Sequence, residues 1–204
     1  MKIVRGLLMS IVSAVVLFGI SGCSSMPVVT RESSDAMIDV SGNWNDTDSQ
    51  LVSKEMISDS LSRPWLTEFV AAKNSKPRVI VGEVINKSHE HINTETFVSD
   101  LERELTNSGQ VKFVASKSQR DEMRAERADQ AQNSSMATAK AAGNETGADF
   151  MIKGKINTIM DEAGKISLKY YQIELELIDM ANGEKAWIGQ KKIKKVVKKS
   201  SSSF

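Results

Sequence analysis

The only cysteine of the chain, Cys23, lies at the end of an apolar N-terminal segment. Two cations, Lys2 and Arg5, precede an apolar run from Gly6 to Ile20, and Ser21-Gly22 places small residues directly before the cysteine. This order is typical of a secretory signal peptide over residues 1–22. A cysteine at its end indicates the lipoprotein form, in which the sulfur is acylated and Cys23 becomes the mature N-terminus. Because lipid then occupies the only thiol, the fold must form without an intramolecular disulfide.

Two other interpretations of this segment are a transmembrane anchor and an uncleaved ordinary signal peptide. The apolar run is interrupted by Ser10 and Ser13, and it is shorter than the roughly 20 residues that a spanning helix needs. Several acyl chains on Cys23 provide stable membrane attachment without a span. The residue after the cysteine is Ser24, whereas Asp at this place commonly retains Gram-negative lipoproteins in the inner membrane. We therefore expect an outer-membrane lipoprotein whose domain faces the periplasm.

The charge balance of the mature chain excludes an obvious nucleic-acid partner. Removal of Lys2 and Arg5 with the signal peptide leaves 25 of the 27 basic residues against 26 acidic ones, so there is no basic excess. The remaining length suits one domain with a tether. Residues 23–43 lack helical or strand periodicity and are predicted to form a lipidated flexible tether, with a relaxed span of about 25 Å. The Ser-rich residues 198–204 are predicted to be a disordered tail.

Helical periodicity appears in several stretches. Asp48 is expected to cap a helix whose apolar stripe includes Val52, Met56 and Leu61. Pro64 suits the first position of a second short helix. The clearest pattern runs from Thr94 to Asn107, where Phe97, Leu101 and Leu105 recur on one helical face. A polar helix over 118–133 and an Ala-rich helix over 135–144 follow.

Strand patterns occupy the region around residue 80 and the last third of the chain. The β-branched run from Val79 to Ile85 predicts a strand covered on both faces, and Val111–Val114 predicts a short strand. Alternation from Phe150 predicts a strand that ends in a turn at 161–164. The next strand changes phase, so a β-bulge near Tyr170-Tyr171 is expected. Asn182-Gly183 predicts a two-residue hairpin turn, followed by a strand over 185–197 with Trp187 facing inward.

The predicted order ααβαβααβββ indicates an α+β fold over residues 44–197. It comprises one mixed sheet, helices packed against it and a C-terminal antiparallel meander.

Candidate sites for chemistry are few. His89 and His91 resemble a metal-ligand pair, but they lie in a predicted polar loop without further His or Cys to complete a site. None of the common nucleophile or phosphate-binding motifs is present. We expect no catalytic residues, no metal and no cofactor. The lysine-rich stretch 191–199 would either attract anionic head groups or protect an edge strand from pairing with other chains; edge protection is the favoured interpretation.

Several stretches of the chain resemble LpoB-type lipoproteins, the outer-membrane activators of bifunctional penicillin-binding proteins. The stretches that carry the resemblance, in order, are Trp44-Asn45, Leu51–Lys54, Met56, Val79–Ser88, the helix of Phe97, Leu101 and Leu105, Gly109–Val114, the Ala-rich segment, Gly147–Met151 and Asn182–Trp187. The resemblance covers about residues 44–197. It implies a fold similar to the N-terminal domain of TolB.

The same resemblance implies a function without chemistry. Members of this family bind a small domain of a peptidoglycan synthase, a penicillin-binding protein, and raise its rates, so the chain is expected to act as a monomeric, non-enzymatic regulator of cell-wall synthesis. The resemblance does not identify any residue of this chain as a contact with the partner. The alternative is a structural assembly lipoprotein related to curli-secretion or flagellar outer-membrane components.

Overall fold

The structure is a computed structural model that describes residues 29–33, 36–140, 143 and 145–198. The chain divides into two compact units, Met1–Ala36 and Met37–Phe204. The described residues of the first unit form neither helix nor strand. The predicted signal peptide, Cys23 and residues 199–204 lie outside the described part, so the predictions made for them remain predictions.

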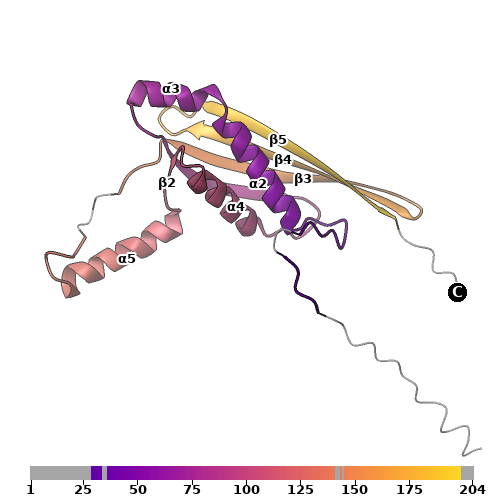
Figure 1. The fold of residues 1–204 in the computed structure, drawn as a ribbon, viewed down its shortest axis with the longest axis horizontal. Coiled ribbons are helices and arrows are strands. Elements are labelled where there is room, and N and C mark those ends of the chain that lie inside the picture. The colour runs from indigo at the N-terminus through magenta and orange to yellow at the C-terminus, as the bar shows by residue number, and fades with distance from the viewer. Residues whose placement is uncertain (1–28, 34–35, 141–142, 144, 199–204) are drawn as a thin grey trace, which may run out of the picture. The chain divides into compact units, whose positions relative to one another are not determined.

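The second unit is an α+β fold built on one mixed five-stranded sheet (Figure 1). Its elements are α2 (Asp46–Leu61), α3 (Pro64–Lys73), β1 (Arg78–Lys87), α4 (Thr94–Asn107), β2 (Lys112–Phe113), α5 (Lys117–Asn133), β3 (Phe150–Ala163), β4 (Ile166–Asp179) and β5 (Lys185–Lys198). The strand order is β2-β1-β3-β4-β5, with β1 parallel to β2 and β3. The strands β3, β4 and β5 form an antiparallel meander. The predicted fold class is therefore confirmed.

The helix starts follow local capping rules. The cap of α2 is Asn45, whose side chain accepts a hydrogen bond from the Asp48 backbone N–H, while the Asp48 side chain accepts from the Asn45 N–H. This reciprocal capping box corrects the prediction that Asp48 is the cap. Pro64 occupies the first turn of α3, as predicted. The helix α4 has the predicted bounds, and Gly109 follows it at φ 64°, a conformation that favours glycine.

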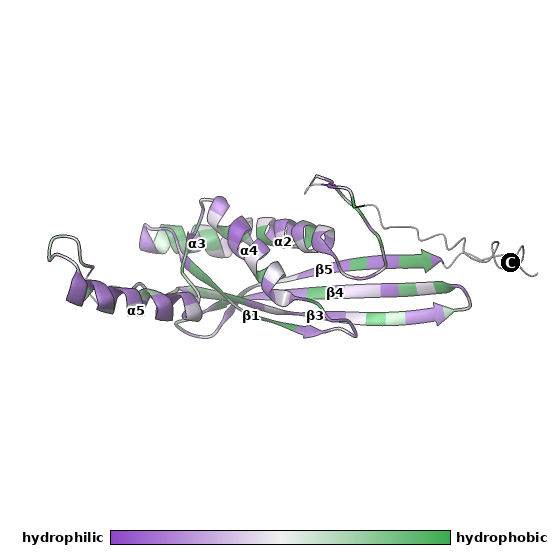
Figure 2. Ribbon diagram, turned by 90° about the horizontal axis from the view of Figure 1, so that it is seen from below, coloured by the Kyte–Doolittle hydropathy of each residue, from purple (hydrophilic) through white to green (hydrophobic). Residues whose placement is uncertain are grey.

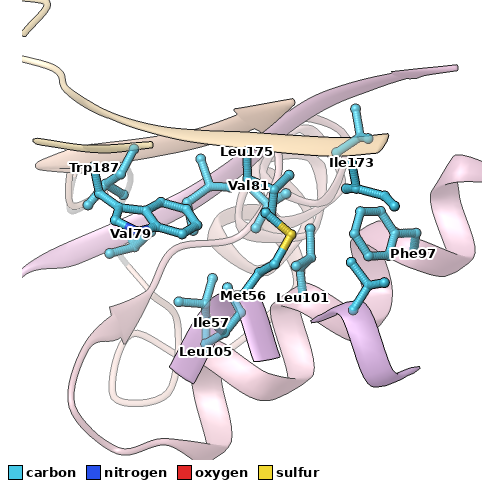
Figure 3. Close-up of a cluster of buried hydrophobic side chains, with 14 of the residues drawn as sticks. Met56, Ile57, Val79, Val81, Phe97, Leu101, Leu105, Ile173, Leu175 and Trp187 are labelled. Atoms are coloured by element: carbon cyan, nitrogen blue, oxygen red, sulfur yellow. The ribbon is translucent and has the colours of Figure 1, made fainter. Parts of the chain in front are cut away.

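The core lies between one face of the sheet and the helices α2, α3 and α4 (Figure 2). Side chains from β4 that point to this face, Ile173 and Leu175, are fully buried against Leu101 and Leu105 of α4 and Met56 of α2 (Figure 3). We call this the helix-covered face and the opposite one the open face. The prediction that β1 is covered on both sides holds only for its first half, where Val79, Ile80 and Val81 are all buried; further along, Ile85 on the open face is 42% exposed.

The β3–β4 hairpin runs in continuous register from the pair Phe150–Asp179 to the pair Ala163–Ile166. The predicted bulge near Tyr170-Tyr171 is therefore wrong, and so is the turn over 161–164, because β3 extends to Ala163. Since the register is unbroken, the change of phase means that the apolar side chains at Ile166, Leu168 and Tyr170 lie on the open face.

Two further predictions need correction. The loop after β4 spans Met180–Glu184 rather than two residues; Asp179 accepts hydrogen bonds there from the backbone N–H groups of Ala181 and Gly183. The Ala-rich helix over 135–144 is absent from the described residues of that stretch, because α5 ends at Asn133 and turns follow. Met136 is fully exposed, so the segment has no apolar face to bury, and burial is what stabilises most short helices.

Truncation of Leu101 tests the core. Leu101 is fully buried under β4, whereas Leu51 on α2 is 45% exposed. We expect Leu101→Ala to lower the free energy of unfolding by about 3 kcal/mol, because the lost transfer free energy and the cavity left behind add together. The matched control Leu51→Ala should change it by less than about 0.5 kcal/mol. Urea unfolding of both variants measures the difference, and equal losses would contradict this description of the core.

Candidate interaction surface

The chain enters the second unit through a segment with bends at residues 40–43, which packs on the helix-covered face. The Trp44 ring contacts Phe97 and Tyr171 edge-on, at centroid distances of 5.9 and 5.8 Å. Gly42 lies against the Val197 side chain without room for a Cβ atom. The Tyr171 hydroxyl donates to the Gly42 carbonyl at 3.0 Å. The last residues of the predicted tether are therefore part of the folded domain.

Three ion pairs, made by two lysines, hold this segment in place. Lys195 Nζ lies 2.6 Å from Asp48 and 2.8 Å from Asp39. Lys169 Nζ lies 2.6 Å from Glu90. The side chains of Lys195, Asp48, Lys169 and Glu90 are all at most 15% exposed, so removal of one partner would leave a charge unpaired in a poorly solvated place. We call the set Asp39–Trp44, Asp48, Glu90, Lys169, Tyr171 and Lys195 the N-terminal clamp.

The electrostatics of the clamp favour the charged forms. Burial opposes ionisation of Glu90, but hydrogen bonds from Lys169 and Tyr171 outweigh it and lower the pKa of this carboxyl. Burial also opposes the charge on Lys195, yet hydrogen bonds to Asp39 and Asp48 raise its pKa. Burial and the Glu90 carboxylate raise the pKa of Tyr171, which therefore stays protonated as a donor. The clamp thus holds its geometry at neutral pH.

The lysine-rich stretch divides between the two faces of β5, which is an edge strand of the sheet, as predicted. On the helix-covered face, Lys191 pairs with Glu55 and Lys195 belongs to the clamp. The side chains of Lys192, Lys194 and Lys198 alternate with these, and no described residue forms an ion pair with them. Neutralised lysines therefore lie on one face and unpaired lysines on the other.

The open face carries a charged central zone around a shallow hollow of about 280 Å³. We call this zone the central open face; its residues are Glu83, Ile85, Lys87, Lys153, Gly154, Lys155, Glu174 and Glu176. Lys155 lies 2.9 Å from Glu174, and this hydrogen-bonded pair raises the pKa of the lysine and lowers that of the carboxyl. Among the described residues, the side chains of Lys87 and Lys153 have no ion-pair partner.

The remaining candidate residues do not assemble into a chemical site. His89 Nδ1 lies 2.9 Å from the Thr158 hydroxyl, and His91 is exposed in the same loop. Within the described part of the chain, no three His, Cys, Asp or Glu side chains are grouped as metal ligands; the expected absence of a metal or cofactor stays a prediction. None of the described helices has the length and apolar character of a bilayer span. The clamp and the central open face were not found from the sequence, because both depend on strand register.

Glu90→Gln tests the clamp. We expect a loss of about 2 kcal/mol in the free energy of unfolding at neutral pH, because a charge-assisted hydrogen-bond pair is broken. Since the pKa of Glu90 is lowered in the folded state, its contribution is present above its ordinary pKa and disappears as the pH falls through the lowered value. The free energies of unfolding of variant and parent, measured in urea, should therefore converge as the pH falls below this lowered pKa.

The exposed Glu83 provides the matched control, since no described residue pairs with its side chain. Glu83→Gln should leave the free energy of unfolding within about 0.5 kcal/mol of the parent at neutral and at acidic pH. A difference between Glu90→Gln and parent that stays constant on acidification would contradict the role given to this carboxylate.

Comparison with known proteins identifies the family. The family described as "Peptidoglycan-synthase activator LpoB" matches residues 48–193. The C-terminal domain of LpoB from Salmonella enterica is 14% identical, with a TM-score of 0.36, over 66% of this chain and 98% of that domain. The corresponding domain from Escherichia coli is 15% identical, with a TM-score of 0.37, over 64% of this chain and 93% of that domain. The NMR structure of Escherichia coli LpoB is 14% identical, with a TM-score of 0.41, over 89% of this chain and 86% of that protein.

The search among curated proteins finds no match. The family match nevertheless spans every helix and strand from α3 to β4, with most of α2 and β5. The resemblance found in the sequence is thereby confirmed. The chain belongs to the LpoB family of peptidoglycan-synthase activators.

Proposed function

We propose that this protein is a monomeric outer-membrane lipoprotein, anchored through acylated Cys23, that binds a penicillin-binding protein and activates it as a peptidoglycan synthase. The observation that carries the proposal is the family match over residues 48–193, because the family is one of peptidoglycan-synthase activators. This is an activator family rather than a catalytic one. An activator needs no reaction chemistry of its own; it needs a higher affinity for the active state of the synthase than for the inactive state.

The central open face is the surface that we propose for the synthase. It lies on the three neighbouring strands β1, β3 and β4, away from the hairpin end of the meander, and its side chains are not covered by the helices. Lys87 and Lys153 lie on it without ion-pair partners among the described residues, which leaves their charges available to a partner.

Charge reversal at Lys153 tests both the partner and the surface. The bait is the full-length, affinity-tagged protein, and the readouts are recovery of penicillin-binding proteins from solubilised envelopes and the glycan polymerisation rate of the recovered synthase. Lys153→Glu should reduce recovery about tenfold or more, because like charges placed opposite each other in an interface cost several kcal/mol.

Lys54→Glu is the matched control. Lys54 is an exposed lysine on α2, in the helical layer, and no described residue pairs with its side chain. This variant should recover as much synthase as the parent. Equal losses in both variants would exclude the central open face as the contact. Failure of the parent to enrich any penicillin-binding protein over beads without bait would exclude the proposed function itself.

A further inference from the structure

The meander extends past the helices that cover the rest of the sheet (Figures 1 and 2). We call this part the hairpin end; it comprises residues 158–163 of β3, 166–170 of β4 and 194–198 of β5. Its open face carries the apolar side chains of Ile159, Ile166, Leu168, Tyr170 and Val196. Ile159 is 64% exposed, Val196 54% and Ile166 49%.

These side chains form one continuous patch. Ile159 is the cross-strand neighbour of Tyr170, and Leu168 is the neighbour of Val196, so they adjoin each other on the same face. Exposed apolar residues gathered in this way mark an interaction site more often than scattered ones do. The patch also explains the change of phase in β4, since its apolar residues there lie on the face opposite the core.

Cations surround this patch. Lys192, Lys194 and Lys198 share the open face of β5, and Lys165 lies in the turn; none has an ion-pair partner among the described residues. One carboxylate, Asp161, occupies the same face, opposite Leu168. The surface therefore combines apolar side chains with a net positive charge, which is the composition that adsorbs to an anionic lipid surface.

The clamp brings the start of the second unit to this same end. Asp39 pairs with Lys195, and Gly42 contacts Val197. The segment from Cys23 to Met37 has 14 residue steps, so it reaches at most about 50 Å when extended and about 20 Å when relaxed. A lipid on Cys23 would thus keep the hairpin end near the membrane surface.

We propose that the hairpin end rests on the anionic phospholipid surface beside the protein's own lipid anchor, with Ile159, Ile166 and Val196 in the interfacial layer and the unpaired lysines among the head groups. Protection of an edge strand would be provided by lysines on either face of β5. It therefore does not account for the difference between the two faces, since the lysines on the helix-covered face are neutralised whereas those beside the apolar patch are not. The inference rests on the proposed acylation of Cys23 and is independent of the synthase.

The experiment uses the full-length lipoprotein, reconstituted into vesicles of phosphatidylcholine and phosphatidylglycerol that contain a lipid-borne quencher. Val196→Cys and Ile166→Cys each introduce one thiol for an environment-sensitive fluorophore, because acylation blocks Cys23. The control is Met180→Cys, 51% exposed in the loop at the other end of β4. We expect a blue shift and strong quenching at 166 and 196 and neither at 180. Quenching should weaken at high salt and in vesicles of phosphatidylcholine alone.

Equal quenching at 180 and 196, or none at 196, would overturn the inference. Labelling of the parent chain would also overturn it, because Cys23 would then be free of lipid. In the Val196→Cys background, Ile166→Glu should abolish the quenching, with an unchanged circular dichroism spectrum to show that the domain still folds. The same variant should still recover the synthase, so loss of the lipid contact and failure of the proposed function are distinguishable.

Discussion

The sheet is longer than the layer that covers it, and most features of this domain follow from that mismatch. Strands of 14 residues extend about 45 Å, whereas the helices α2, α3 and α4, of 16, 10 and 14 residues, extend only about 24, 15 and 21 Å. The helices bury one face of the sheet where Leu101 and Leu105 lie. Past the ends of the helices, the side chains of the strands must either be covered by another part of the chain or remain exposed.

On the helix-covered side, the N-terminal clamp provides this covering. Ile173 and Leu175 contact the helices, whereas Tyr171 and Lys169, nearer the start of β4, contact the incoming chain and Glu90 instead. A buried network of this kind contributes to stability only while each member keeps its partner. It therefore fixes where the chain enters the domain more strictly than apolar contacts would, because a shift of the segment leaves charges unpaired.

Sequence periodicity was enough to predict the fold class, the helix α4 and the inward-facing Trp187, because these depend on local pattern and on one buried face. It failed where tertiary context decides. The phase change at Tyr170 has two solutions, a bulge or an unbroken strand whose apolar side chains change to the open face, and the pairing register with β3 and β5 selects between them. The clamp was equally beyond prediction, since Asp39 and Lys195 are 156 residues apart. The alternating lysines of β5 were visible in the sequence, but their partners were not.

The proposed lipid and synthase contacts are compatible because the sheet separates them. With the proposed anchor at Cys23, the short segment that follows would limit how far the domain can move from the membrane, and so would restrict how far away a partner can be contacted. A rigid sheet changes this limit, since a strand held at its hairpin end can carry its other end up to about 45 Å from the lipid surface. The central open face lies between the two ends, so the reach of this protein depends on the length and stiffness of its strands as much as on its tether. If the domain is anchored as proposed, the long strands would therefore serve the same purpose as a long linker.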